Sequence, residues 1–109
     1  MSYRDDLTRM ARVEVVVEGE DVPALRDLMA AAGVVGFTMV SGVSGLGHGG
    51  YRSGSSMFNE HDSQSLVLAV APEDRIETLV VGVRELLRER PGVMFVSDVY
   101  VSRPDHFRW

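Results

Sequence analysis

"QSLVLAVAPEDRIETLVVGVRELLRERPGVMFVSDVYVS" spans residues 64–102 and reads as strand, helix and strand in succession. Residues 64–71 and 93–102 are rich in β-branched and aromatic side chains, which favour strands. Between them, apolar residues recur at helical spacing from Ile76 to Leu87. Acidic residues open this predicted helix and arginines close it, as the helix dipole favours. Pro91 and Gly92 end it.

The upstream stretch "ARVEVVVEGEDVPALRDLMAAAG" (residues 11–33) repeats the strand and helix pattern. Its valines predict a strand that is buried largely on both faces. Asp21 is expected to accept the free amides of the first helical turn, Pro23 fits that turn, and Gly33 is a left-handed stop. "VVGFTMVSGV" (34–43) then predicts a second strand.

The predicted order is strand, helix, strand, long loop, strand, helix, strand, which is the pattern of a ferredoxin-like βαββαβ sandwich of the α+β class. Two helices would cover one face of the sheet. The other face is rich in Val, Met and Phe without polar alternation, so a monomer would expose an unusually large apolar area. We therefore expect that face to pack against further copies of the chain.

Composition narrows the functional classes. The chain has 109 residues, enough for one domain (1–109), and a net charge of -5, which disfavours nucleic-acid binding. It has no cysteine, so thiolate metal sites and cysteine nucleophiles are excluded. The N-terminal extension (1–10) does not resemble a signal peptide, and no apolar run approaches the roughly 18 residues of a membrane span. A cytoplasmic protein without direct membrane insertion is expected.

The long loop contains "SGVSGLGHGGYRSGSSMFNEHD" (41–62), in which GLGHGG matches G-x-G-x-x-G. The glycines do not indicate a dinucleotide site, because no helix start follows them. They do not indicate a P-loop either, because no Lys-Ser or Lys-Thr pair follows them. The glycines would let backbone amides approach an anion, and Arg52 adds a planar fork of donors. The loop is thus either an anion clamp or a permissive hairpin connection.

Two other chemistries remain as alternatives. The chain contains three histidines, His48, His61 and His106, together with Glu60 and Asp62. These side chains could hold a divalent metal ion, although their spacing matches no closed tetrahedral site. A slow nucleotide hydrolase is a third interpretation, but the sequence offers no positioned general base. Phe37 and Met39 are either core residues or one wall of an adenine slot.

Three stretches together resemble the PII signalling family and its PII-like relatives: "AAAGVVGFTMVSGVSGLG" (30–47), "APEDRIETLVVGVRELL" (71–87) and "GVMFVSDVYV" (92–101). The resemblance covers about Arg12 to Arg103. It implies a homotrimer of ferredoxin-like subunits with a T-loop at 44–63, a C-terminal tail at 103–109 and adenine nucleotide in the clefts between subunits. The metal alternative would instead resemble the copper-tolerance ferredoxin-like trimers.

The resemblance also implies site residues. Gly36, Phe37 and Thr38 would border the base. Gly45, Leu46 and Gly47 would approach the ribose and phosphates. Gly92 and Val93 would close the cleft from the adjacent subunit.

The departures from the PII pattern reduce the expected positive charge around a ligand. Val93 stands where the family has a phosphate-binding lysine, and the loop tyrosine, Tyr51, lacks the context of the modification site. "PDHF" replaces a basic pair and leaves Arg103 as the nearby guanidinium. Since each phosphate charge needs a partner, ADP or AMP is favoured over ATP.

"YRSG" is similar to the T-loop segment of PII-like proteins linked to carboxysomes or bicarbonate transporters, in which it reaches back to the phosphates. Arg52 and Ser53 match that segment. The likeness implies a non-enzymatic sensor without catalytic residues or a metal, whose T-loop orders around nucleotide or bicarbonate. Its expected protein partner is a transporter or the carbon-fixation machinery.

Overall fold

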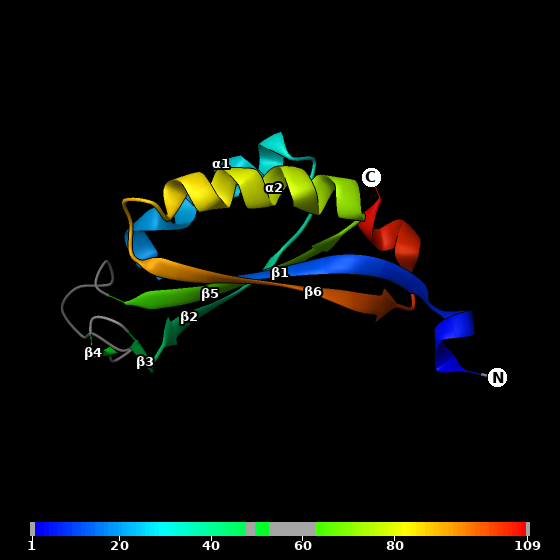
Figure 1. Cartoon of the computed structure of the whole chain (residues 1–109), viewed down its shortest axis with the longest axis horizontal. Coiled ribbons are helices and arrows are strands. Elements are labelled where there is room, and N and C mark those ends of the chain that lie inside the picture. Colours follow the sequence, from blue (N-terminus) through cyan, green and yellow to red (C-terminus); the bar gives the residue numbers. More distant parts are fainter. Residues whose placement is uncertain (1, 48–49, 53–62, 109) are drawn as a thin grey trace.

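The computed structural model describes residues 2–47, 50–52 and 63–108. The elements follow in the order η1 (Tyr3–Asp6), β1 (Thr8–Glu18), η2 (Gly19–Asp21), α1 (Val22–Ala31), β2 (Thr38–Val43), β3 (Gly45–Gly47), β4 (Gly50–Arg52), β5 (Gln64–Ala71), α2 (Glu73–Leu86), β6 (Gly92–Val101) and η4 (Pro104–Phe107). Figure 1 shows α1 and α2 on the same face of the sheet.

Four strands form an antiparallel sheet in the order β2-β5-β1-β6. The strands that are central in space, β5 and β1, are separated in sequence by a helix and an edge strand, as in a split βαβ arrangement. The predicted ferredoxin-like α+β fold is therefore confirmed. A second sheet, which the sequence analysis did not predict, is the short hairpin of β3 and β4.

The core lies between the helices and one face of the sheet. Alternate residues of β1, namely Val13, Val15 and Val17, are at most 1% exposed and face the helices. They pack with alternate residues of β5 and with the apolar stripes of both helices. In the single chain β1 is fully buried only on its helix face, because Arg12, Glu14 and Val16 point to the open face and are half-buried.

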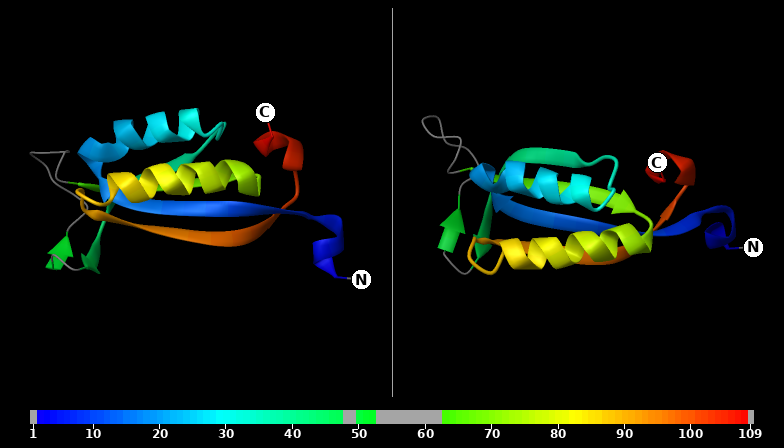
Figure 2. Two further views of the ribbon diagram at one scale, coloured as in Figure 1. Left: turned by 45° about the horizontal axis from the view of Figure 1, so that its top comes forward. Right: turned by 90° about the horizontal axis from the view of Figure 1, so that it is seen from above.

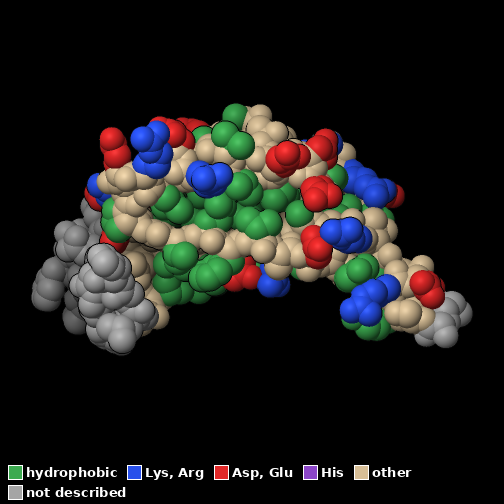
Figure 3. Space-filling view, viewed as in Figure 1, with side chains coloured by type: hydrophobic (Ala, Val, Ile, Leu, Met, Phe, Trp, Pro, Cys, Tyr) green, Lys and Arg blue, Asp and Glu red, His purple; other side chains and the backbone are tan. Residues whose placement is uncertain are grey.

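The open face carries an apolar row that crosses all four strands. Strand register aligns Val40, Leu66, Val16 and Val93 across β2, β5, β1 and β6, and we call these four residues the open-face row. Val40 and Val93 are 49% and 44% exposed, and Phe95, on the same face of β6, is 57% exposed. Hydrophobic side chains are visible in Figure 3 below the sheet, on the side away from the helices. Such a contiguous apolar surface is unusual for a free monomer.

Helix ends follow the predicted local chemistry with one exception. Gly33 has φ +74 and ends α1, because its amide and that of Val34 donate to the carbonyls of Ala30 and Met29. Pro23 lies in the first turn, as expected. Asp21, however, makes no capping hydrogen bond to α1, because its carboxylate is engaged by Arg90 instead.

The N-terminal residues extend the sheet and then leave it. β1 begins at Thr8, inside the predicted N-terminal extension. The η1 turn before it is attached to β6 through an edge-to-face contact between Tyr3 and Tyr100, and the Arg4 guanidinium lies over both rings. Figure 1 shows this turn at the same end of the molecule as the C-terminus.

Candidate functional site

A cleft of about 870 Å³ opens beside the start of β2. Three segments line it: the connection from α1 into β2, the second half of β5, and the C-terminal η4 turn. The lining residues are Val35, Gly36, Phe37, Thr38, Leu68, Ala69, Val70, His106 and Phe107. Most of this lining is apolar, so the cleft suits a flat organic ring.

The cleft exists because β2 begins later than its sequence predicts. We expected a strand over 34–43, but the hydrogen bond from Val34 to Met29 holds the chain against α1, and pairing with β5 starts only at Thr38 opposite Leu68. β5 continues for three residues beyond that pair, along β1 but without β2 beside it. Within this stretch Val70 is half-buried, whereas Ala69 and Ala71 are at most 1% exposed.

Aromatic rings stand on opposite walls of the cleft. Phe37, 40% exposed, lies on the β2 side, and the Arg26 guanidinium is 5.7 Å from the centre of its ring. His106 and Phe107 lie on the η4 side, in an edge-to-face contact with 5.0 Å between ring centroids. Rings in such positions can stack on a planar ligand.

The predicted site residues fall into two groups at opposite ends of the sheet. Gly36, Phe37 and Thr38 line the cleft, and Arg103 immediately precedes η4. The β3 strand, Gly45–Gly47, follows the other end of β2, which is six residues or about 20 Å long at 3.3 Å per residue. Both views in Figure 2 place the β3–β4 hairpin and η4 at opposite ends of the molecule.

Gly92 and Val93 belong to the hairpin end. The first pair of β1 and β6 joins Val17 to Gly92, next to Glu18, which pairs with Gln64 at the end of β2. A single chain therefore does not bring Gly92 and Val93 to the cleft that contains Phe37. A site using both groups requires residues from two copies of the chain.

The remaining predicted residues lie partly outside the described structure. The backbone of Arg52 ends β4, whereas Ser53, His48, His61, Glu60 and Asp62 lie outside the described residues. Within residues 2–47, 50–52 and 63–108, no group of three or more acidic or histidine side chains is arranged to hold a metal ion.

The role of η4 in forming the cleft was not predicted from the sequence. The sequence predicts His106 only as a candidate metal ligand and predicts no role for Phe107. The available signal was the pair of adjacent rings in "PDHF" just after the last strand. Nothing in that pattern says that the segment turns back toward β2, because this depends on contacts with residues far away in sequence.

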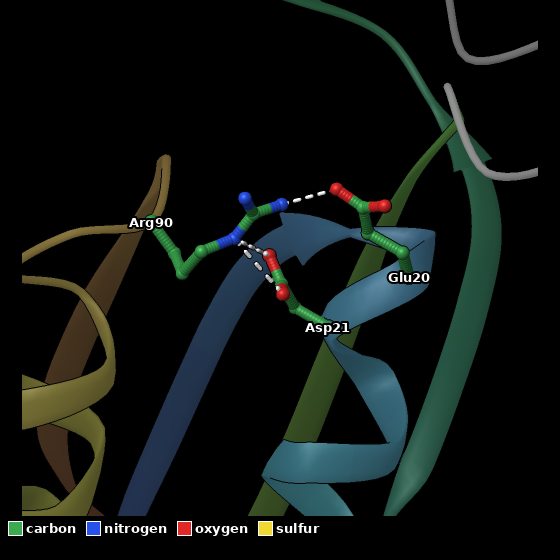
Figure 4. Close-up of polar contacts among 3 residues, drawn as sticks. All are labelled: Glu20, Asp21 and Arg90. Atoms are coloured by element: carbon green, nitrogen blue, oxygen red, sulfur yellow. Dashed lines mark hydrogen bonds and ion pairs between the residues drawn. The ribbon is translucent and has the colours of Figure 1, made fainter.

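An ion-pair cluster fixes the turn between α2 and β6 at the hairpin end (Figure 4). Arg90 Nε donates to both carboxylate oxygens of Asp21, at 3.1 and 3.0 Å, and its Nη2 donates to Glu20. The bonds to Asp21, and next those to Glu20, raise the pKa of the Arg90 guanidinium. Asp21 is only 8% exposed, so this cluster joins η2 to the α2–β6 turn at a partly buried position.

Asp21→Asn is expected to lower the urea midpoint, because it removes a buried negative charge and one of the two oxygens that accept from Arg90 Nε, which leaves Glu20 as the charged partner of Arg90. Asp105→Asn is the control, since the Asp105 side chain is fully exposed and its nearest guanidinium is 4.0 Å away. Because the pKa of Arg90 is raised above its ordinary value, the contribution of its charged form to stability is complete below that ordinary value and is lost as the pH rises through the raised pKa. Deprotonation of Arg90 should therefore not change stability between about pH 7 and pH 10. Equal midpoints for both variants would contradict a structural role for the cluster.

The fold and the cleft define a class of protein: a ferredoxin-like α+β chain with an open sheet face and a cleft suited to a flat ring. The chain belongs to the nitrogen regulatory protein P-II family, whose model matches residues 10–106. No curated protein sequence matches it. No helix in the described part of the chain has the length and apolar character needed to cross a membrane.

Solved structures include relatives with substantial identity. A PII-like protein, CPII, from Thiomonas intermedia K12, bound to ADP, AMP and bicarbonate, is 36% identical, with a TM-score of 0.87 over 94% of this chain and 96% of that one. CPII bound to ADP and bicarbonate matches with 32% identity and a TM-score of 0.84, covering 94% and 97%. A putative PII-like signalling protein from Thermus thermophilus, at 17% identity, 94% and 98% coverage and a TM-score of 0.78, shares the fold.

Proposed function

We propose that this protein is a non-enzymatic signalling protein that binds ADP or AMP between subunits of a homotrimer. The observation that carries the proposal is the division of the site residues between opposite ends of one chain. A second copy would supply Gly92, Val93 and the β3–β4 end to the cleft around Phe37. The open-face row gives the copies an apolar surface on which to associate.

The cleft is chemically suited to adenine. Its apolar floor, formed by Leu68, Ala69 and Val70, and the Phe37 and His106 rings on its walls can enclose a flat heterocycle. The CPII structures that are 36% and 32% identical contain ADP, and one of them also AMP, which supports this ligand class.

The number of phosphates is limited by charge. Arg90, the guanidinium of the α2–β6 turn, is already engaged by two carboxylates, and the chain as a whole carries a net charge of -5. Each further phosphate adds negative charge that needs a partner in an acidic chain, so ADP or AMP is favoured over ATP. Arg52 and Ser53 would contact the phosphates, and Arg103 lies beside the cleft wall.

Bicarbonate is the proposed second ligand, held by Arg52 and loop amides. Both of these CPII structures contain bicarbonate. The T-loop (44–63) would then favour one conformation when nucleotide or bicarbonate is bound and present a different surface to a target protein. By analogy with PII-like relatives, the target belongs to inorganic-carbon uptake or fixation.

Calorimetric titration with AMP, ADP and ATP tests the ligand assignment. Phe37→Ala should weaken AMP and ADP alike, by about ten-fold or more, since stacking of a base on an aromatic ring contributes roughly 1–3 kcal/mol. Arg52→Ala should weaken the binding of ADP more than that of AMP, because we assign the Arg52 side chain to the phosphates and ADP carries one phosphate more. Val81→Ala, at a 68% exposed position on α2, is the control.

Two results would contradict the assignment. Equal affinities for wild type and Arg52→Ala would remove Arg52 from the mechanism. Strong thermal stabilisation by divalent copper or zinc, with none by nucleotides, would favour the metal-binding alternative.

A further inference from the structure

We propose that Arg75 is a positioning residue of the cleft, which holds the C-terminal wall at a set distance from the β2 wall. The inference rests on the proposed function, because it assigns the spacing of these walls to recognition of a base. Arg75 is absent from the cleft lining, so its role would be exerted through the backbone segments that it joins.

The Arg75 guanidinium bridges two segments that are distant in sequence. Its Nη1 donates to the Gly33 carbonyl at 3.1 Å, and its Nη2 donates to the Arg108 carbonyl at 3.2 Å. Gly33 lies two residues before Val35, where the β2 wall begins, and Arg108 directly follows Phe107 in the opposite wall. One planar group thus connects both walls at their outer ends.

The bridge has a rigid base. Arg75 lies in the first turn of α2, where its amide donates to the Pro72 carbonyl, and its side chain is half-buried. A Cβ at Gly33 would lie 3.7 Å from Arg75 Cδ, so the aliphatic part of the arginine already packs against this turn. The left-handed conformation of Gly33 ends α1 where its carbonyl accepts from Arg75.

Within residues 2–47, 50–52 and 63–108, the hydrogen bonds and ion pair described below join residues of the η4 segment to one another. His106 donates its amide to the Arg103 carbonyl, Arg108 donates its amide to the Asp105 carbonyl, and Arg108 pairs with Asp105 at 4.0 Å across an exposed surface. These contacts preserve the turn but do not attach it to the rest of the fold. Arg75 and the half-buried Phe107 contribute to that attachment.

The test compares Arg75→Met and Arg75→Lys with Arg84→Met, a control that removes the same charge from an exposed position on the same helix. The first measurement is amide hydrogen exchange of residues 103–108 in the ligand-free protein. The second is calorimetric titration with AMP. Circular dichroism and the thermal midpoint establish that each variant is folded.

Arg75→Met should accelerate exchange in 103–108 and weaken AMP binding by about ten-fold, as expected when hydrogen bonds to a charged group are lost. Arg75→Lys should keep part of the exchange protection and part of the AMP affinity, because the lysine ammonium retains the charge but lacks the planar fork of donors. Arg84→Met should behave as wild type.

Unchanged exchange in Arg75→Met would overturn the bridge. Faster exchange with unchanged AMP affinity would overturn the positioning role, since the wall would then be released without consequence for the ligand. Wild-type protein that binds no nucleotide would refute the proposed function and, with it, positioning for a base. In that case the exchange data would still report whether Arg75 holds the segment.

Discussion

Phe95→Asp is expected to convert the proposed trimer into monomers and to abolish the proposed nucleotide binding. Phe95 is 57% exposed in one chain and lies beside the open-face row, so the substitution leaves the monomer core intact. Between copies it would bury a carboxylate without a partner, at a cost of several kcal/mol for each subunit. Because the residues of the proposed site divide between two ends of the chain, ADP affinity should fall by more than about 100-fold when the copies separate.

Analytical ultracentrifugation at micromolar concentration measures the first effect, and calorimetry measures the second. Val81→Asp is the matched control, since it places the same charge at a 68% exposed position on α2, away from the open face. It should remain trimeric and bind ADP normally. A trimeric Phe95→Asp variant, or a monomeric wild type, would contradict association through the open face.

Gly92→Ala is expected to destabilise the fold by roughly 3 kcal/mol, a large share of the 5–15 kcal/mol typical of a domain. Gly92 has φ +149, a conformation that residues with a Cβ rarely adopt. A Cβ there would also lie 2.6 Å from the Val16 carbonyl oxygen and 2.8 Å from Leu87 Cδ2. The Leu87 side chain can rotate away, but the Val16 carbonyl belongs to the central strand.

Urea unfolding at fixed protein concentration measures this difference. Gly36→Ala is the control, because a Cβ at Gly36 meets nothing within 4 Å and its φ is not positive. Its free energy of unfolding should stay within about 0.5 kcal/mol of wild type. Equal urea midpoints for Gly92→Ala and Gly36→Ala would contradict this prediction, because they would show that β6 can start in another conformation without loss of stability.

Local patterns predicted most elements because each was strongly periodic or clearly bounded. The strand over 64–71 and the helix ending before Pro91 were recognisable from side-chain type and from residues at their ends. The start of β2 was wrong by four residues, since "VVGF" has strand composition but Val34 is held by α1. Aspartate is a favoured helix N-cap residue, but the carboxylate of Asp21 instead accepts hydrogen bonds from Arg90, which lies far along the chain.

The candidate site was predictable in parts. The resemblance drew attention to Gly36, Phe37 and Thr38, which line the cleft together with Leu68 and Val70 of β5. It did not anticipate His106 and Phe107 on the opposite wall. It also assigned Gly45–Gly47 and Phe37 to one ligand without indicating that β2 separates them by its full length.

The sequence by itself determined the order of the two helices and of the four strands of the main sheet, the helix-covered face and the glycine stop of α1, since these depend on side-chain periodicity and on the conformations that each residue allows. Only the tertiary structure decided where β2 joins the sheet, which partner Asp21 takes and how η4 and Arg75 build a cleft wall. Those outcomes depend on contacts between residues far apart along the chain, and in such contacts a nearby charge or an earlier packing constraint outweighs local preference.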